Sequence, residues 1–305
     1  MSEWGSGKGG QSKVPESRLW HFTLTPYILK REPSKLVEED IFPIHSIFEK
    51  QQVNANRKNR ITANFNLKIG DDLLPMEASV PDARTSALEL IPVFQQLTNQ
   101  VVAHAIELTE RQGKTISCKA GCGACCKQPI PVTLLEVEHL NRVVKRMPEQ
   151  KQQRVRATFA HHLKAVTDAG LLVKLKSINT LETDQKHQLA RDYFELGLDC
   201  PFLENQSCGI YQDRPLECRE FLVTSDPRHC AELDQQGIEH IERPIWMSSA
   251  LRELSIDSQN SDDRGWVPMI FALELARSGR LKFKKKLGRD WLESFIQHAI
   301  GKKLK

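Results

Sequence analysis

The eight cysteines of this 305-residue chain stand in two groups, and no cysteine lies outside them. Four of them fall within the nine residues from Cys118 to Cys126, with the spacing Cys-x3-Cys-x2-Cys-Cys. The other four follow the spacing Cys-x7-Cys-x9-Cys-x11-Cys between Cys200 and Cys230. The fold, or a bound metal, therefore has to bring together two groups of thiols that are far apart in the chain.

The expected cellular compartment decides what such cysteines do. The first residues, Met1 to Lys8, lack the apolar stretch of a secretory signal, and no run approaches the length of a membrane span. We therefore expect a cytoplasmic protein with no membrane partner. In a reducing compartment, clustered cysteines indicate metal binding or redox chemistry more than structural disulfides. A chain of this length can also bury a core without cross-links.

Thiolates are soft ligands that suit zinc or iron-sulfur clusters, and eight of them are enough for two four-cysteine sites. The candidate metal ligands are therefore Cys118, Cys122, Cys125, Cys126, Cys200, Cys208, Cys218 and Cys230. A thiol-disulfide device and inert buried thiols are the alternatives. The side chains of the adjacent Cys125 and Cys126 diverge, so that one of them can serve a second metal or stay free.

The residues around the cysteines also favour a metal site. Gly121 and Gly123 let the backbone turn tightly and aim amide hydrogens at sulfur. Arg219, next to Cys218, is the cation that we favour for balancing thiolate charge. A dry apolar wall is expected from four residues near the second group, namely Phe202, Ile210, Tyr211 and Phe221.

The predicted fold class is mainly α (α+β): a helical body, a small N-terminal β-hairpin and an irregular eight-cysteine core. The hairpin is predicted from three features: apolar alternation over residues 61–69, a turn signal at Gly70-Asp71-Asp72, and a second strand over 73–80. A long helix is expected after Pro81, ending at Gly113, with Pro92 either kinking it or beginning it. His104 lies beside its apolar stripe and is interpreted as a core histidine, not a ligand.

Further helices are expected on both sides of the second cysteine group. Thr133 and Glu136 form a capping box that predicts a helix start. Pro215 is expected to open a short helical turn that carries Cys218. The other predicted segments are helices over 148–170, 184–196, 266–276 and 290–300, and a polar loop over 255–263.

These elements suggest four segments along the chain. Residues 1–55 are expected to be flexible or irregular. Residues 56–113 hold the hairpin and the long helix, and residues 114–235 form a cysteine-cluster metal-binding domain. Residues 236–305 are expected to form a C-terminal helical segment packed on that domain.

Several short motifs accompany the cysteines: Cys200-Pro201-Phe202-Leu203, Cys208-Gly209-Ile210-Tyr211 and Arg214-Pro215-Leu216-Glu217-Cys218-Arg219. Together with Cys118 to Cys126 and Cys230, they resemble the YkgJ-type cysteine-cluster family, also described as a zinc- or iron-chelating CxxCxxCC domain. The resemblance covers roughly Ser117 to Ala231 and includes all eight cysteines of the pattern. It implies a metal or iron-sulfur centre, in a family that mostly lacks an assigned reaction.

Among the possible functions, we favour a cytoplasmic metal-binding protein with a cysteine-ligated zinc or iron-sulfur centre and an unassigned reaction. The cysteine region is also similar to that of flagellin lysine methylases, which implies methyl transfer from S-adenosylmethionine to protein lysine. The chain shows no glycine-rich nucleotide loop after a strand, which counts against that alternative. The spacing from Cys118 to Cys125 is also that of radical S-adenosylmethionine enzymes, but the adjacent Cys126 and the helix-rich surroundings depart from that family.

A structural zinc module that binds protein or nucleic acid is the remaining alternative. The basic run from Lys282 to Arg289, with Lys302, Lys303 and Lys305 beyond it, could contact phosphates. A solvated helix face is the explanation that we favour for this run, because the formal net charge of the whole chain is only +4. Nucleic acid is therefore not an expected partner, whereas a protein partner is left open.

Overall fold

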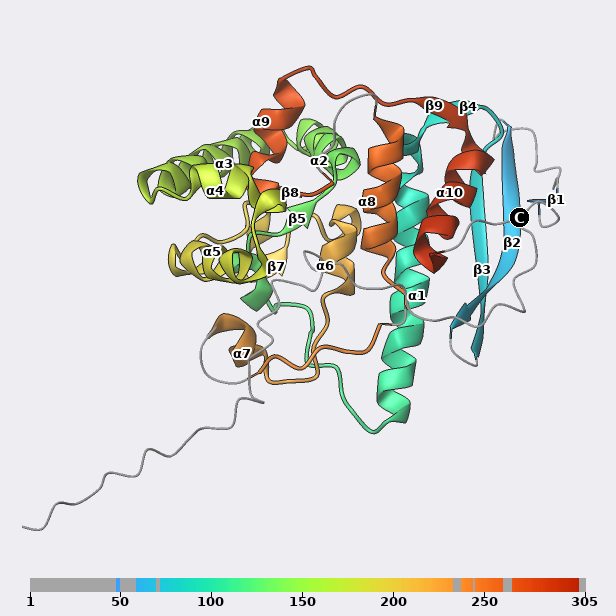
Figure 1. Cartoon of the computed structure of the whole chain (residues 1–305), viewed down its shortest axis with the longest axis horizontal. Coiled ribbons are helices and arrows are strands. Elements are labelled where there is room, and N and C mark those ends of the chain that lie inside the picture. Colours follow the sequence, from blue (N-terminus) through green and yellow to red (C-terminus); the bar gives the residue numbers. More distant parts are fainter. Residues whose placement is uncertain are drawn as a thin grey trace, which may run out of the picture.

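A computed structural model describes residues 48–49, 59–69, 72–232, 237–243, 245–259 and 265–301. The helices make up most of this part of the chain and the strands are few and antiparallel, so the predicted mainly α class with some β is confirmed (Figure 1). The predictions for residues 1–47 and 50–55, for the turn residues 70–71, and for Lys302, Lys303 and Lys305 lie outside the described residues. No helix in the described ranges has both the length and the hydropathy needed to cross a membrane.

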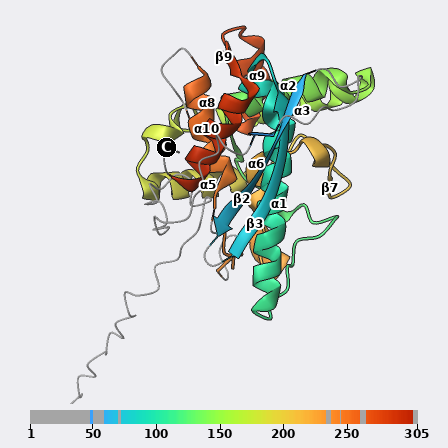
Figure 2. The ribbon, with the colours of Figure 1, turned by 90° about the vertical axis from the view of Figure 1, so that its right-hand side faces the viewer.

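The predicted hairpin is confirmed. Strand β2 (Arg60–Ile69) pairs antiparallel with β3 (Asp72–Pro81), and the short β1 (Phe48–Glu49) pairs with the other edge of β2. Alternate residues of β2 are buried, because the period of two places one face of the strand against the helices. The hairpin lies along α1, as the views in Figures 1 and 2 show.

The long helix α1 (Ile91–Arg111) follows a single turn of 3-10 helix, η3 (Ala87–Leu90). Pro92 stands in its first turn, where a missing N–H costs no helical hydrogen bond, so this proline begins the helix and does not kink it. Gly113 follows the helix with φ 76°, the left-handed conformation that glycine adopts most easily. His104 is buried in α1, as predicted, with Nε2 3.3 Å from Asp72 Oδ2.

The first apolar core joins the hairpin and α1 to two helices from the end of the chain, α8 (Met247–Ser258) and α10 (Gly288–Ile300). Phe94 stacks on Phe295 with ring centroids 4.2 Å apart. Trp291 is fully buried, and its Nε1 donates to the carbonyl of Thr85 at 2.9 Å. Burial of side chains of this size stabilises the fold by about 2–3 kcal/mol each. Strand β4 (Arg84–Ser86) pairs with β9 (Lys285–Leu287) at the edge of this core.

The second apolar core lies around α2 (Leu134–Arg146), α3 (Glu149–Asp168) and α9 (Ala272–Arg277). The capping box is present, since Thr133 Oγ1 accepts from Glu136 N and the Glu136 carboxylate accepts from Thr133 N. Strands β5 (Pro131–Val132) and β8 (Val267–Pro268) pair beside it, and β8 leads into η7 (Met269–Phe271). Phe159 meets Phe202 edge to face, which joins this core to the second cysteine group.

A third, smaller core packs α4 (Leu172–Lys176), η5 (Ile178–Thr180) and α5 (Thr183–Glu195) against the end of α3. Helix α5 confirms the helix predicted over 184–196. The first core contains residues from 61–101 and from 245–300, so it crosses two of the proposed segment boundaries. The division of the chain into four segments stays a prediction.

Three sequence predictions need correction. The helix expected over 266–276 begins only at Met269, because the residues before it form β8, whose Pro268 is followed by the 3-10 turn. The polar loop expected from Ser255 overlaps the last turn of α8, where Ser255 and Ser258 are buried. The basic run from Lys282 is not a solvated helix face: Lys285–Leu287 is strand β9, and α10 begins at Gly288.

Candidate metal centre

The first cysteine group forms a tight loop between α1 and α2. Ser117 N donates to Val223 O at 2.9 Å, which fixes the start of this loop to the chain beyond α6. Gly121 has φ 87°, so the sharp turn predicted beside Cys122 is confirmed. The 3-10 turn η4 (Ala124–Lys127) then carries Cys125 and Cys126.

The second group comes from four separate pieces of structure. Cys200 follows α5, and Cys208 lies in β7 (Ser207–Cys208), which pairs with β6 (Leu203–Glu204). Cys218 lies in the short helix α6 (Leu216–Glu220) directly after Pro215, as predicted. Cys230 lies in α7 (Pro227–Ala231), a short helix that the sequence did not indicate. Figure 1 shows α6 between α5 and α1, and α7 below α5 in that view.

The fold brings both groups together around η4. Cys200 N donates to Cys126 O at 2.6 Å, and α7 packs on η4. The Cys125 thiol interacts electrostatically with thiols of both groups, namely those of Cys118, Cys200, Cys208, Cys218 and Cys230. Cys122 interacts in the same way with Cys118 and Cys230. All eight cysteines are free thiols.

An apolar wall surrounds the thiols, largely as predicted. Phe202, Ile210 and Phe221 are buried and contact cysteines. Tyr211 is the exception, since 55% of its surface is exposed and the Arg214 guanidinium stacks on its ring at 4.1 Å. The prediction that Tyr211 belongs to the dry wall is therefore wrong: η6 (Tyr211–Asp213) turns this side chain outward.

Burial raises the pKa of most of these thiols. The pKa values of Cys200 and Cys230 rise to about 12, and those of Cys118, Cys208 and Cys218 also rise above the ordinary value. The pKa of Cys125 is raised well above its usual range, first by the hydrogen bond with the Cys126 thiol and then by burial. At neutral pH these thiols hold their protons unless a cation displaces them.

Backbone amides oppose this effect at four sulfurs, and for Cys125 the hydrogen bond comes from its own backbone. Hydrogen bonds from the backbone of Phe202, Ile210 and Val223 lower the pKa of Cys200, Cys208 and Cys118, respectively. For Cys200 and Cys208 the donor lies two residues after the cysteine, in a turn held by Leu203 N to Cys200 O at 2.8 Å and by the β6–β7 pairing. Amide hydrogens aimed at sulfur stabilise thiolates that ligate a metal.

The positive charge near the thiols comes mainly from a residue that sequence reasoning did not favour. Arg219 is buried, but its guanidinium donates to Asn99 Oδ1 at 2.9 Å and to the carbonyls of Gln212 and Arg214. It therefore holds the loop before α6 more than it balances thiolates. Arg214 lowers the pKa of Cys118, Cys125 and Cys208, three thiols drawn from both groups.

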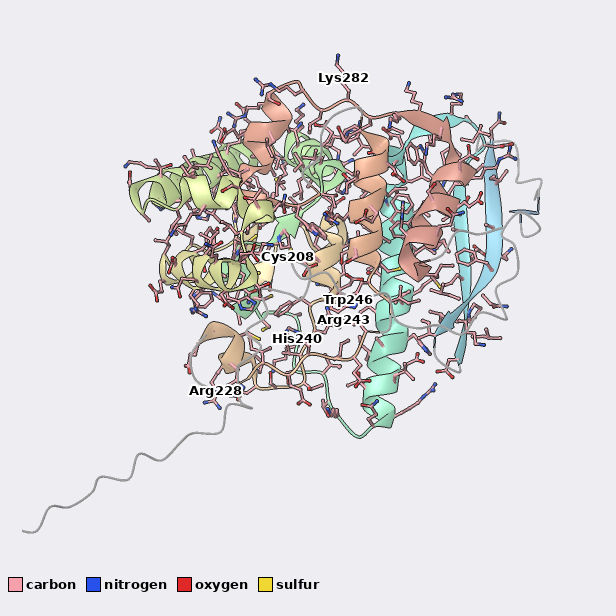
Figure 3. The ribbon with its side chains drawn as sticks, viewed as in Figure 1. Cys208, Arg228, His240, Arg243, Trp246 and Lys282 are labelled. Carbon is pink, nitrogen blue, oxygen red and sulfur yellow. The ribbon has the colours of Figure 1, made fainter. Side chains whose placement is uncertain are left out.

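Figure 3 shows a further set of residues below α6 in that view, where His240, Arg243 and Trp246 lie near one another. The His240 ring packs edge-on against Phe221 at 4.8 Å, and Arg243 stacks on Trp246 at 3.8 Å. Burial, and to a smaller extent Arg243, lowers the pKa of His240 to about 4. Nothing in the local sequence singled these residues out, because their contacts are long-range.

The thiols gather near η4, but their side chains do not form a metal-binding geometry. Across the residues that the structure describes, no three His, Cys, Asp or Glu side chains are placed so that they could hold one metal ion. The donor chemistry fits zinc or iron all the same, since the thiols are soft, mostly desolvated and met by backbone amides.

A comparison with known families agrees with this chemistry. Residues 117–240 match the family model CxxCxxCC, described as "Putative zinc- or iron-chelating domain". This segment is similar to the CxxCxxCC family. The resemblance seen in the sequence is confirmed, and the matched range extends past Cys230 to His240. No curated protein and no solved structure matches the chain.

Proposed function

We propose that the CxxCxxCC domain binds zinc or an iron-sulfur cluster through its cysteine thiolates. The proposed ligands are Cys118, Cys122, Cys125, Cys126, Cys200, Cys208, Cys218 and Cys230. The observation that carries this proposal is the position of Cys125, whose thiol interacts with thiols from four other pieces of the structure. A set of structural thiols with no ligand role has no reason to converge in this way.

Binding has to be coupled to proton release. Burial holds the pKa values of Cys200 and Cys230 near 12, so both thiols are protonated at neutral pH before a metal binds. Thiolates that held a cation there would have lost those protons, and the amides of Phe202 and Ile210 would support the charge on Cys200 and Cys208. A bound zinc would act as a structural cross-link, and an iron-sulfur cluster would add the capacity to transfer an electron.

The site is connected to the helical body through two buried carboxylates. Glu136 of α2 accepts from Leu216 N at 2.8 Å, and Glu220 of α6 accepts from Met247 N at 2.7 Å. Helix α6, which carries Cys218, is thereby tied to the starts of α2 and α8. Because structural metal binding can supply on the order of 10 kcal/mol to folding, we propose that the metal stabilises both cores.

The state of the thiols also supports the proposed cytoplasmic location. All eight cysteines are free, which suits a compartment that keeps thiols reduced.

Metal analysis of the full chain after anaerobic purification tests the proposal. Brown protein with stoichiometric iron and sulfide identifies an iron-sulfur centre, and colourless protein with zinc identifies a zinc centre. Replacing Cys122 or Cys218 by serine should release metal and lower the melting temperature. Ser207→Ala, beside Cys208 and exposed, is the matched control and should change neither. Unchanged metal content and melting temperature in both cysteine variants would refute the ligand assignment.

A further inference from the structure

The eight thiols are not packed as one set, because they contact two different apolar clusters. Cys230 is buried with Phe221 and Val223, and Cys118 and Cys125 pack against the same cluster. Cys200 and Cys208 pack instead against the core that contains Phe202 and Ile210. This division cuts across the two sequence groups, since Cys230 joins the thiols of the first loop.

The electrostatic interactions follow the same division. Cys118, Cys122 and Cys230 form one trio, because the first two raise the pKa of Cys230. Cys200, Cys208 and Cys218 form the other, because the first two raise the pKa of Cys218. Cys125 acts on members of both trios, so it lies at their boundary.

The 3-10 turn η4 explains how one short segment can serve both trios. A 3-10 helix has three residues per turn, so adjacent side chains point about 120° apart. The Cys125 side chain packs in the cluster of Cys118 and Cys230. The Cys126 thiol hydrogen-bonds the Cys125 thiol, and the Cys126 carbonyl accepts the 2.6 Å hydrogen bond from Cys200 N, so Cys126 lies between Cys125 and the start of the second cysteine group. The double cysteine can thus supply one ligand in each direction.

From this geometry, and resting on the proposed metal-binding function, we infer two separate four-thiol metal sites. Site one consists of Cys118, Cys122, Cys125 and Cys230. Site two consists of Cys126, Cys200, Cys208 and Cys218. Four thiolates are the full complement for a structural zinc ion or for one iron-sulfur cluster, so each site is complete without the other.

The stoichiometry of the full-length chain gives the first test. We expect two zinc ions or two iron-sulfur clusters per chain by native mass spectrometry and metal analysis. In addition, a titration of the metal-free chain with Co²⁺ should give a thiolate-to-cobalt absorption that grows linearly to two equivalents and then stops. A chain that takes up no metal would refute the proposed function itself. A break at one equivalent would leave metal binding intact and overturn the division into two sites.

Serine variants then assign the ligands. Cys230→Ser and Cys208→Ser should each keep one metal, and the double variant should keep none. The controls Ala231→Ser and Ser207→Ala, each next to the exchanged cysteine, should keep both. If either single cysteine variant lost both metals while its melting curve remained cooperative, the two sites would not be separate.

The double cysteine provides the sharpest comparison. In the Cys230→Ser background site one is already lost, so adding Cys125→Ser should leave the second metal bound. Adding Cys126→Ser to the same background should release it. The reverse pattern would exchange the two cysteines between the sites, and loss in both cases would mean that the pair bridges the sites, which contradicts the inference.

Discussion

The carboxylate of Glu136 offers a direct test of how the helical body holds the cysteine domain. This side chain is buried and accepts from Thr133 N at 2.8 Å, from Thr133 Oγ1 at 3.0 Å and from Leu216 N at 2.8 Å. It therefore closes the capping box of α2 and, with its second oxygen, holds the start of α6. Glu136→Ala removes all three acceptor contacts at once.

The loss of stability in Glu136→Ala follows from the backbone N–H groups that would lose their acceptor. Thr133 and Leu216 are both buried, so their two backbone N–H groups would have no acceptor and no access to water. A buried unsatisfied donor costs roughly 1–3 kcal/mol, so the free energy of unfolding should fall by about 2–5 kcal/mol. Because the urea dependence rises with chain length, about 3 kcal/mol per M applies to this chain, and the midpoint should drop by about 0.7–1.7 M.

Urea unfolding followed by circular dichroism measures this shift, with metal content determined on the same samples. Glu138→Ala is the matched control, because Glu138 lies in the same helix, is partly exposed and pairs with Arg142 and Asn141 among the described residues. It should cost about 0.5 kcal/mol or less. If Glu136→Ala shifted the midpoint no more than Glu138→Ala, the assigned role of Glu136 would be wrong. If Glu136→Ala were destabilised but still bound its full complement of metal, Glu136 would stabilise the start of α2 without being needed to position Cys218.

Two further perturbations address other parts of the fold. His240 has a folded-state pKa of about 4 against an ordinary value of 6.5, so its contribution to stability is present above pH 6.5 and is lost as the pH falls toward 4. Because the side chain is partly exposed, we expect the free energy of unfolding to fall by about 1–2 kcal/mol over that pH range. The variant His240→Asn should reduce the dependence of the unfolding midpoint on pH. An unchanged pH dependence in this variant would contradict the lowered pKa of His240. Gly288→Ala would place a Cβ 2.2 Å from the Pro81 carbonyl oxygen, a backbone atom, and should lower stability by about 1–3 kcal/mol. Gly237→Ala is the control and should be neutral, because a Cβ there would meet no atom within 4 Å and the backbone is not left-handed. Equal melting temperatures for the two variants would show that the contact between the new Cβ and Pro81 relaxes without loss of stability.

Local patterns in the sequence predicted the elements whose cause is local. The alternation of β2, the stripe of α1 and the capping box of α2 each depend on residues within a few positions of one another. The same holds for the tight turn at Gly121 and for Pro215 before α6. Helix α8 was not predicted as a separate helix, although Met247, Ala250, Leu251 and Leu254 stand at helical spacing and are all buried.

Other features depend on contacts that no local pattern contains. Strand β8 takes the first residues of the predicted 266–276 helix because Val267 pairs with Val132. The basic run becomes strand β9 because its backbone pairs with β4, two hundred residues earlier in the chain. Arg214 lowers the pKa of three of the thiols, whereas the buried guanidinium of Arg219 is held mainly by Asn99 and by two backbone carbonyls.

The sequence by itself determined that eight thiols have to meet and that soft ligands of this kind favour zinc or iron, because those conclusions need only residue types and spacing. Only the tertiary structure decided which thiols are neighbours. Cys230 lies beside the first cysteine loop because α7 packs on η4. Cys200 lies beside the same turn because its backbone N–H donates to the carbonyl of Cys126. Spacing along a chain limits which residues can approach each other, whereas packing between distant segments selects the approaches that occur.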